Sequence, residues 1–105
     1  MSAAPKYDVF DGIADPTRRE ILSLLAKEKM NVTDISDHFP VTRTAVSKHL
    51  KILKGANLVK EEKVGRARIY ELNPHALKEV KDWLMYYEQF WDEKIMNLQK
   101  LFNEK

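Results

Sequence analysis

The longest regular pattern of apolar positions runs through the C-terminal third of the chain. From residue 74 to residue 105 no glycine interrupts the sequence, and Pro74 suits the first turn of a helix capped by Asn73. Apolar residues recur there every seven positions and again three or four positions further on, as in the seam of a coiled coil. The pattern predicts one uninterrupted helix over residues 74–105. The seam consists of Leu77, Val80, Leu84, Tyr87, Trp91, Leu98 and Leu101.

This helix is too long for a small domain to cover. At ~1.5 Å per residue, about thirty residues extend for roughly 45 Å. Trp83, Tyr86 and Phe90 widen its apolar face. We therefore expect a second copy of the chain to cover the seam in a homodimer, with Phe10 helping to close the interface. The alternative is a helix that folds back over its own domain. A helix lying on a membrane is disfavoured, because acids and bases mix on the polar face.

Two shorter helices are predicted near the N-terminus. Residues 7–14 form an amphipathic segment that Gly12 weakens. Asp15 then suits a helix cap and Pro16 the first helical position, where its missing N–H costs nothing. The apolar positions that follow predict a second helix ending near Lys27.

A third short helix and a turn lead into the centre of the chain. Residues 31–39 predict a helix capped by Asn31 or Thr33. Pro40 breaks the pattern, and a turn over residues 39–42 follows. We expect Val41 to pack between the helices on either side and to set their angle.

The segment from Thr42 to Lys54 predicts a helix with two contrasting faces. Val46, Leu50 and Leu53 form a narrow apolar stripe. The opposite face has no acid, and it suits a DNA major groove, with base edges read at the front and phosphates contacted behind. An ordinary solvated amphipathic helix is the alternative. The residues of this face are Arg43, Thr44, Ser47, Lys48, Lys51 and Lys54.

Two strands follow the basic helix. Residues 58–64 and 67–72 predict a β-hairpin whose turn is Gly65-Arg66, and Gly55 and Asn57 are suited to end the preceding helix. A hairpin directly after a basic helix is typical of a wing. The fold class is therefore mainly α with a β-hairpin wing, a winged helix-turn-helix of four helices, two strands and a long fifth helix. We expect one domain over residues 1–105, with its core in 7–73 and a dimerisation helix in 74–105.

Charge is distributed unevenly along the chain. Residues 41–70 hold eight lysines or arginines against two glutamates, a local charge of +6, whereas the other 75 residues carry −4. A basic centre in an otherwise acidic protein is typical of a localised contact with a polyanion. We expect double-stranded DNA to be that partner.

Composition excludes several other functions. The chain has no cysteine, so it holds no disulfide and no thiolate metal site. No apolar run reaches the roughly 20 residues that span a bilayer, and residues 1–6 lack an apolar signal core. We therefore expect a cytoplasmic protein without a membrane segment. No paired carboxylates, catalytic triad or phosphate-binding glycine loop indicates an enzyme, and no cofactor is expected.

The sequence assigns roles on the expected DNA surface. Arg43 is expected to pair with a guanine edge, and Thr42, Thr44 and Ser47 lie where they can touch bases. Phosphate contacts are expected from the helix and from the tip of the wing. Arg18 and Arg19 are more simply explained by pairing with nearby acids, and His49 by orienting the basic helix. The phosphate-contacting residues are Lys48, Lys51, Lys63, Arg66 and Arg68.

Several of these motifs together resemble the ArsR/SmtB family of bacterial transcriptional repressors. The similarity covers roughly residues 10–83, and it implies a winged helix-turn-helix homodimer that binds an imperfect inverted repeat. It also implies repression that is released by an inducer, whose nature the sequence leaves unidentified. The motifs that carry the resemblance are Asp15–Leu22, Asp34-Ile35, Val46–Leu53 and the Gly65-Arg66 turn with Tyr70.

The family's metal sites do not match this sequence. Asn31 and Thr33 occupy the positions of the paired cysteines in the family's thiolate site. In its other common site only His75 remains, followed by Tyr86 and Gln89, and one histidine does not hold zinc in its usual coordination. The extended aromatic C-terminus is similar to the family's non-metal branch. Its aromatic residues are expected in the dimer core, with a pocket for an apolar inducer as the alternative.

A different class of function remains open at this point. In it, the aromatic C-terminal helix docks another protein and DNA binding is vestigial. The charge of +6 over residues 41–70 argues against this alternative, because a vestigial DNA surface has no reason to keep that charge. Binding to random-sequence DNA at low salt separates the two hypotheses.

Overall fold

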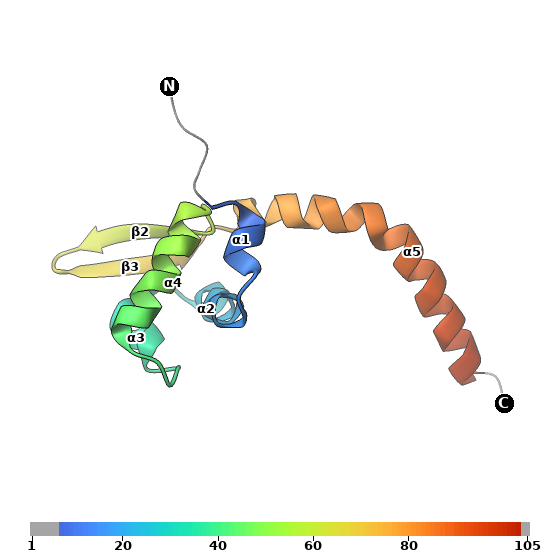
Figure 1. Ribbon diagram of the computed structural model, residues 1–105, viewed down its shortest axis with the longest axis horizontal. Coiled ribbons are helices and arrows are strands. Elements are labelled where there is room, and N and C mark those ends of the chain that lie inside the picture. Colours follow the sequence, from blue (N-terminus) through green and yellow to red (C-terminus); the bar gives the residue numbers. More distant parts are fainter. Residues whose placement is uncertain (1–6, 104–105) are drawn as a thin grey trace, which may run out of the picture.

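A winged body and a long helix that leaves it make up the computed structural model (Figure 1). The structure describes residues 7–103, and at residues 92–96, 98–99 and 102–103 it describes the backbone alone. The elements are α1 (Val9–Ile13), α2 (Pro16–Lys27), β1 (Met30–Asn31), α3 (Val32–Ser36), α4 (Arg43–Gly55), β2 (Val59–Val64), β3 (Ala67–Leu72), a 3-10 turn η1 (Pro74–Leu77) and α5 (Lys78–Asn103).

Side-chain caps explain where the helices of the body begin. The side chain of Asp15 accepts a hydrogen bond from the backbone N–H of Arg18, and that of Asn31 accepts one from Asp34. Each cap gives a partner to a backbone donor that has none inside its helix. The predicted starts of α2 and α3 are thereby confirmed.

The sheet contains one strand more than the sequence predicted. β2 and β3 form the expected antiparallel hairpin, and β1 pairs with the outer side of β3, giving the order β1-β3-β2. The two-residue turn has Gly65 at φ +63°, a left-handed conformation that glycine adopts without steric cost. β1 has two residues only, too few for an alternating pattern to reveal it.

The core of the body lies where α2, α3 and α4 meet the base of the hairpin. Its fully buried side chains include the predicted apolar stripe of α4. Gly12 packs against Leu58, and a side chain at this position would clash with it. The glycine that weakens α1 as an isolated helix therefore lets α1 sit tightly on the body. The largest of these buried side chains are Ile21, Ile35, Leu50, Leu53, Leu58 and Val46.

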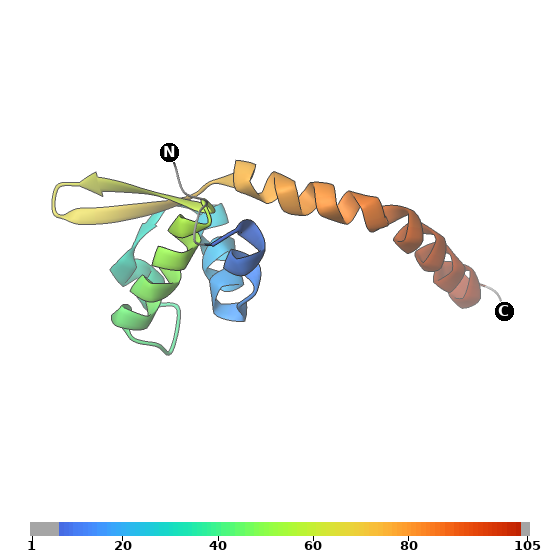
Figure 2. The same ribbon diagram turned by 45° about the horizontal axis from the view of Figure 1, so that its top comes forward.

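α5 extends away from the body, and the molecule measures 62 × 39 × 20 Å along its principal axes. The helix projects outward in both Figure 1 and Figure 2, and only its beginning lies near α1. The expectation of a helix longer than the body can cover is confirmed, but the α-helix begins at Lys78, after the 3-10 turn η1, and not at residue 74. The alternative of a helix folded back over the domain is not what the structure shows. Among the described residues, no helix is both long and apolar enough to cross a bilayer.

Two local predictions were wrong, and a third was right in part. Val41 is 39% exposed, so it does not pack between α3 and α4 and does not set their angle. Asn73 makes no side-chain cap, because its buried amide donates instead to the carbonyl oxygen of Asn57 at 2.8 Å. Gly55 remains within α4, and Asn57, at φ 63°, supplies the left-handed residue just after it.

Candidate nucleic-acid interface

α4 presents its predicted polar face to solvent. The hydroxyl of Thr42 accepts a hydrogen bond from the backbone N–H of Ala45 at 3.1 Å and begins the helix. Burial of the apolar stripe against the body fixes the rotation of α4 about its axis, so the opposite face points outward. The exposed residues of this face are Thr42, Arg43, Thr44, Ser47, Lys48, Lys51 and Lys54.

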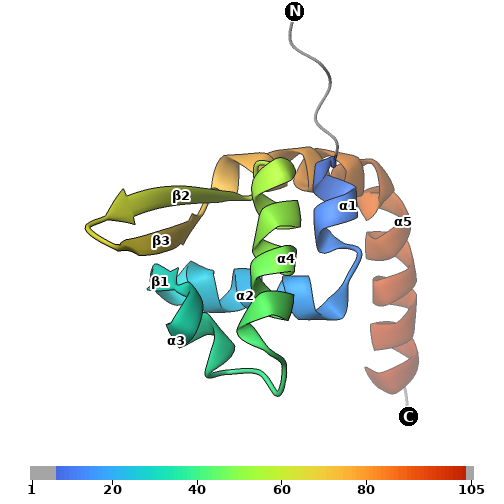
Figure 3. The same cartoon turned by 60° about the vertical axis from the view of Figure 1, so that its left-hand side comes forward.

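The hairpin lies beside α4 and adds further positive charge. In Figure 3 it projects to one side of α4, while α1 and the later part of α5 lie on the other. The register sets Lys63 opposite Arg68, so both side chains leave the same face of the hairpin. Lys63, Arg66 and Arg68 are all exposed. We define the basic face as the exposed polar residues of α4 just named together with these three residues of the wing.

One acid lies within this surface and joins its two parts. Glu61, on β2, accepts a hydrogen bond from Nζ of Lys54 at 2.8 Å and contacts Nη1 of Arg68 at 3.4 Å. The hydroxyl of Tyr70 donates to Oε2 of Glu61, the same carboxylate oxygen that Arg68 contacts. The side chain of Glu61 is only 14% exposed. These contacts tie the last turn of α4 to the wing and fix the angle between them.

The Glu61 contacts alter the acidity of both partners. Hydrogen bonds from Lys54 and then Tyr70 lower the pKa of Glu61 from 4.5 to about 2, since they favour the carboxylate. Burial, followed by the neighbouring carboxylate, raises the pKa of Tyr70 from 10.0 to about 12. This cluster could not be predicted from the sequence, because Lys54 and Tyr70 lie on opposite sides of Glu61 in the chain. An acid inside a run of bases was the only available signal.

Arg18 and Arg19 have structural roles. Nε and Nη2 of Arg18 donate to the carbonyl oxygens of Gly12 and Asp11, both at 2.9 Å, and Arg19 donates to Ile13 at 2.7 Å. These hydrogen bonds tie the first turn of α2 to the carbonyl oxygens at the C-terminal end of α1. The expectation that they serve structure rather than phosphate therefore agrees with their contacts, but their partners are carbonyls and not acids.

His49 lies on the side of α4 that faces the start of α2. Its Nδ1 is 3.4 Å from Nη1 of Arg18 and 3.9 Å from a carboxylate oxygen of Asp15. The pKa of Asp15 is lowered, chiefly by the hydrogen bond from the backbone of Arg18. This placement fits the interpretation that His49 orients the basic helix.

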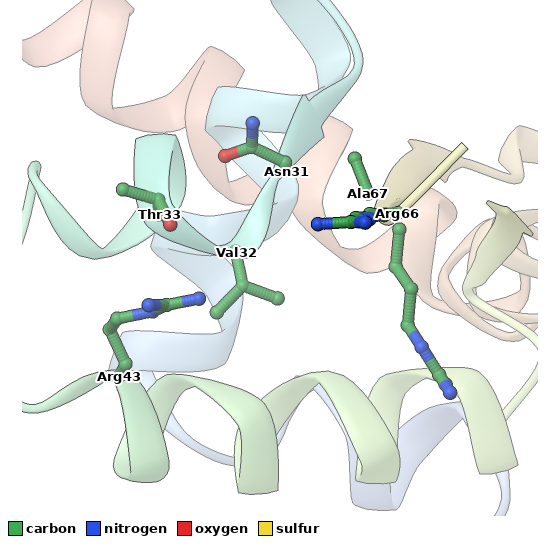
Figure 4. Close-up of a pocket in the computed structure, with 7 residues that line it drawn as sticks. Asn31, Val32, Thr33, Arg43, Arg66 and Ala67 are labelled. Carbon is green, nitrogen blue, oxygen red and sulfur yellow. The ribbon is translucent and has the colours of Figure 1, made fainter. Parts of the chain in front are cut away.

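A small hollow opens between the start of α3, the start of α4 and the wing (Figure 4). The side chain of Arg43 extends toward the start of α3 in this view, and Arg66 approaches from the wing. The sequence assigned these two arginines to separate roles, and the structure brings them to one place. The residues that line the hollow are Asn31, Val32, Thr33, Arg43, Arg66, Ala67 and Arg68.

The predicted dimer residues divide into two groups. Leu77 and Val80 pack partly against the core of their own body, and Phe10 meets Trp83 edge to face at 5.5 Å between ring centroids. Further along α5, Trp91 is 46% and Leu101 is 68% exposed. Leu84 and Tyr87 are half-buried. The side chain of Leu98 falls outside the described residues.

His75, the one residue in common with the family's second metal site, is exposed in η1. Asn31, at the position of a family cysteine, uses its side chain to cap α3. Within the described part of the chain, no three histidine, cysteine, aspartate or glutamate side chains gather as a metal site would need.

Comparisons with known proteins agree with this geometry. The profile of the bacterial regulatory proteins of the arsR family matches residues 15–61. The transcriptional repressor SdpR of Bacillus subtilis is 38% identical over 80 residues, which cover 76% of this chain and 89% of that protein. An HTH-type transcriptional regulator of Mycobacterium tuberculosis is 34% identical over 96 residues, covering 91% of this chain and 87% of the relative.

Solved structures carry the same fold. A crystal structure described as a possible transcriptional regulator for arsenical resistance superposes with a TM-score of 0.70 at 34% identity, covering 86% of this chain and 95% of the other. The winged helix-turn-helix with its long last helix is therefore shared with relatives of similar length. The chain belongs to the ArsR family of bacterial regulatory proteins, which are DNA-binding regulators of transcription.

Proposed function

We propose that this protein represses transcription by binding as a homodimer to an inverted repeat in double-stranded DNA. The general function, regulation of transcription through DNA binding, follows from the family to which the chain belongs. The observation that supports the more specific proposal is the distribution of charge over the surface. The basic face gathers positive side chains of α4 and the wing on one side of the body, while residues outside 41–70 are net acidic.

Roles on the basic face follow from position along α4. Thr44 and Ser47 are short hydrogen-bonding side chains near the N-terminal end of the helix, where a helix in the major groove reads base edges. Lys48 and Lys51 lie further back on the same exposed face and contact phosphates. Because phosphate contacts carry little sequence information, they supply affinity and register rather than selectivity.

The exposed aromatic side chains of α5 support a dimer. Trp83, Tyr86 and Phe90 are 52%, 64% and 48% exposed, although aromatic side chains of this size usually dominate interfaces. A second copy that packs along α5 buries these rings, and two-fold symmetry then presents two basic faces to one duplex. Two α4 helices enter successive major grooves about one helical turn apart. Repression is steric, because the bound dimer occludes polymerase.

Selection of bound fragments from the source genome tests the proposal, followed by affinity measurements on the selected site and on scrambled DNA at several salt concentrations. We expect a site with two related half-sites in inverted orientation. Binding that is equal on selected and scrambled DNA would contradict sequence-specific repression. No binding to any DNA at low salt would favour the alternative of a protein-docking module.

Lys48→Ala separates phosphate contact from base reading. The substitution removes one phosphate contact, so affinity falls for all sequences alike and the salt slope of log K decreases by about one unit. Lys27→Ala is the matched control, since it removes an exposed lysine at the end of α2, outside the basic face. A slope for Lys48→Ala equal to that of Lys27→Ala would remove Lys48 from the interface.

A further inference from the structure

The hollow of Figure 4 has the size and the lining of a site for a small anion. It encloses about 240 Å³, which is less than the roughly 300–1,000 Å³ typical of pockets for drug-sized ligands. Three of its seven lining residues are arginines, and none is an acid. Val32 and Ala67 supply apolar wall, and Thr33 adds a hydroxyl.

Two of the arginines lack counter-charges. Within the described part of the chain, the side chains of Arg43 and Arg66 form no hydrogen bond or ion pair, whereas Arg68 contacts Glu61. They come from different elements, the first residue of α4 and the turn of the wing, and both reach toward the start of α3 (Figure 4). Like charges that converge without an acid repel one another, and an anion between them removes that repulsion.

We propose that this hollow binds one phosphate group, held between the guanidinium groups of Arg43 and Arg66. The planar fork of N–H donors on arginine matches the oxygens of a phosphate, and paired contacts of this kind are stronger than neutral hydrogen bonds. The phosphate comes either from a DNA backbone, a source that rests on the proposed function, or from a soluble phosphorylated molecule. Both sources need the same space, so a soluble phosphate compound at this site displaces DNA.

In this site Arg43 binds phosphate, whereas the sequence predicted that it pairs with a guanine edge. A guanidinium turned toward the wing and the start of α3 contacts the backbone of DNA rather than a guanine edge. Arg43→Ala is therefore expected to leave base preference unchanged across a randomised site and to lower the salt slope by about one unit. Relaxed preference at one position per half-site, with the slope unchanged, would overturn this assignment.

The first arm of the test uses the protein without DNA. Inorganic phosphate and then pyrophosphate are titrated against chloride at matched ionic strength, and the arginine side-chain N–H signals are followed by NMR. Saturable shifts of Arg43 and Arg66 are expected in the parent protein and in Lys27→Ala. In Arg66→Ala, whose exposed position leaves the fold intact, the shift of Arg43 is expected to be lost. This arm remains decisive even if the protein binds no DNA.

The second arm uses duplexes in which one phosphate at a time is replaced by a neutral methylphosphonate. If the phosphate belongs to DNA, one replacement per half-site weakens the parent protein several-fold and has no further effect on Arg66→Ala. Saturable phosphate binding without such a position identifies a soluble ligand as the source, and addition of pyrophosphate then releases DNA from the parent but not from Arg66→Ala. Absence of both signals overturns the proposal.

Discussion

The winged body and the outer part of α5 bury their apolar side chains to very different degrees. In the body, six large side chains are almost completely inaccessible to water. No buried side-chain nitrogen or oxygen among the described residues lacks a hydrogen-bond partner. Along α5, by contrast, Trp83, Tyr86, Phe90 and Trp91 remain about half exposed or more. The body is complete as a fold, and α5 is complete only when another surface covers it.

The boundary between the two regions is a line of aromatic contacts. Trp83 meets Phe10 of α1 and, at 5.3 Å between ring centroids, Tyr87 one turn further along α5. Tyr87 in turn contacts Tyr86 edge to face at 4.9 Å. These edge-on contacts stabilise the direction in which α5 leaves the body. A partner that binds along α5 is therefore held in a defined position relative to α4.

Truncation of the core is expected to have the largest effect. Leu50→Ala removes a side chain with no exposed surface and leaves a cavity beneath the basic face. We expect the free energy of unfolding to fall by about 2–5 kcal/mol in urea titrations. Val64→Ala, at a position 55% exposed in the wing, serves as the control and should change it by less than about 0.5 kcal/mol. Equal losses in both variants would contradict the distinction between a closed body and its open surfaces.

Removal of one aromatic side chain from α5 is expected to weaken the dimer without unfolding the body. Trp91→Ala removes an exposed ring far along the seam, so the body remains folded while the dimer weakens. We expect a loss of at least about 2 kcal/mol in association, close to a 30-fold increase in the dimer dissociation constant. Sedimentation equilibrium measures this constant. Gln89→Ala, on the opposite face of α5 by the heptad repeat, should leave it unchanged, and a parent protein that is monomeric at all concentrations would refute the role of the seam.

The smallest effect concerns pH and the contact between α4 and the wing. Because the folded protein depresses the pKa of Glu61 to about 2 from 4.5, its ionised form stabilises the fold above pH 4.5. That stabilisation disappears as the pH falls from 4.5 to about 2. The parent protein should therefore be more stable than Glu61→Gln at pH 7, with the difference vanishing across this range in urea titrations.

Glu62→Gln is the matched control for that titration. Glu62 is exposed, and the register pairs it with Ile69, so it leaves the other face of the hairpin. Replacing it removes the same charge without disturbing Lys54 or Tyr70. A pH dependence equal to that of Glu61→Gln would show that general repulsion among charges, and not the buried contact, causes the effect.

Local sequence signals predicted the helices and the hairpin well. Caps such as Asp15 and Thr42 act within three residues of themselves, and the confirmed starts of α2 and α4 follow from such contacts. The turn at Gly65 is equally local, because its left-handed backbone conformation favours glycine. The extension of α5 beyond the body also followed from the sequence, since its length exceeds what the body can cover.

Features that depend on distant residues were not predictable in the same way. Asn73 is a residue type that often caps helices, yet its side-chain amide donates a hydrogen bond to the carbonyl oxygen of Asn57, sixteen residues earlier in the chain. Val41 has an apolar side chain that would suit the core, but the turn that contains it lies on the surface. The presence of Arg43 and Arg66 in the lining of one hollow depends on the angle between α4 and the wing, which no pattern along the chain encodes.

The most direct test of the central claim is a hydroxyl-radical footprint of the protein on its selected DNA site. Two basic faces held by one pair of α5 helices should protect two segments whose centres are separated by about one helical turn, 10–10.5 bp. Trp91→Ala should lose both segments together at concentrations where the parent protein protects them. A single protected segment at saturation, or two segments that Trp91→Ala occupies independently, would contradict the account.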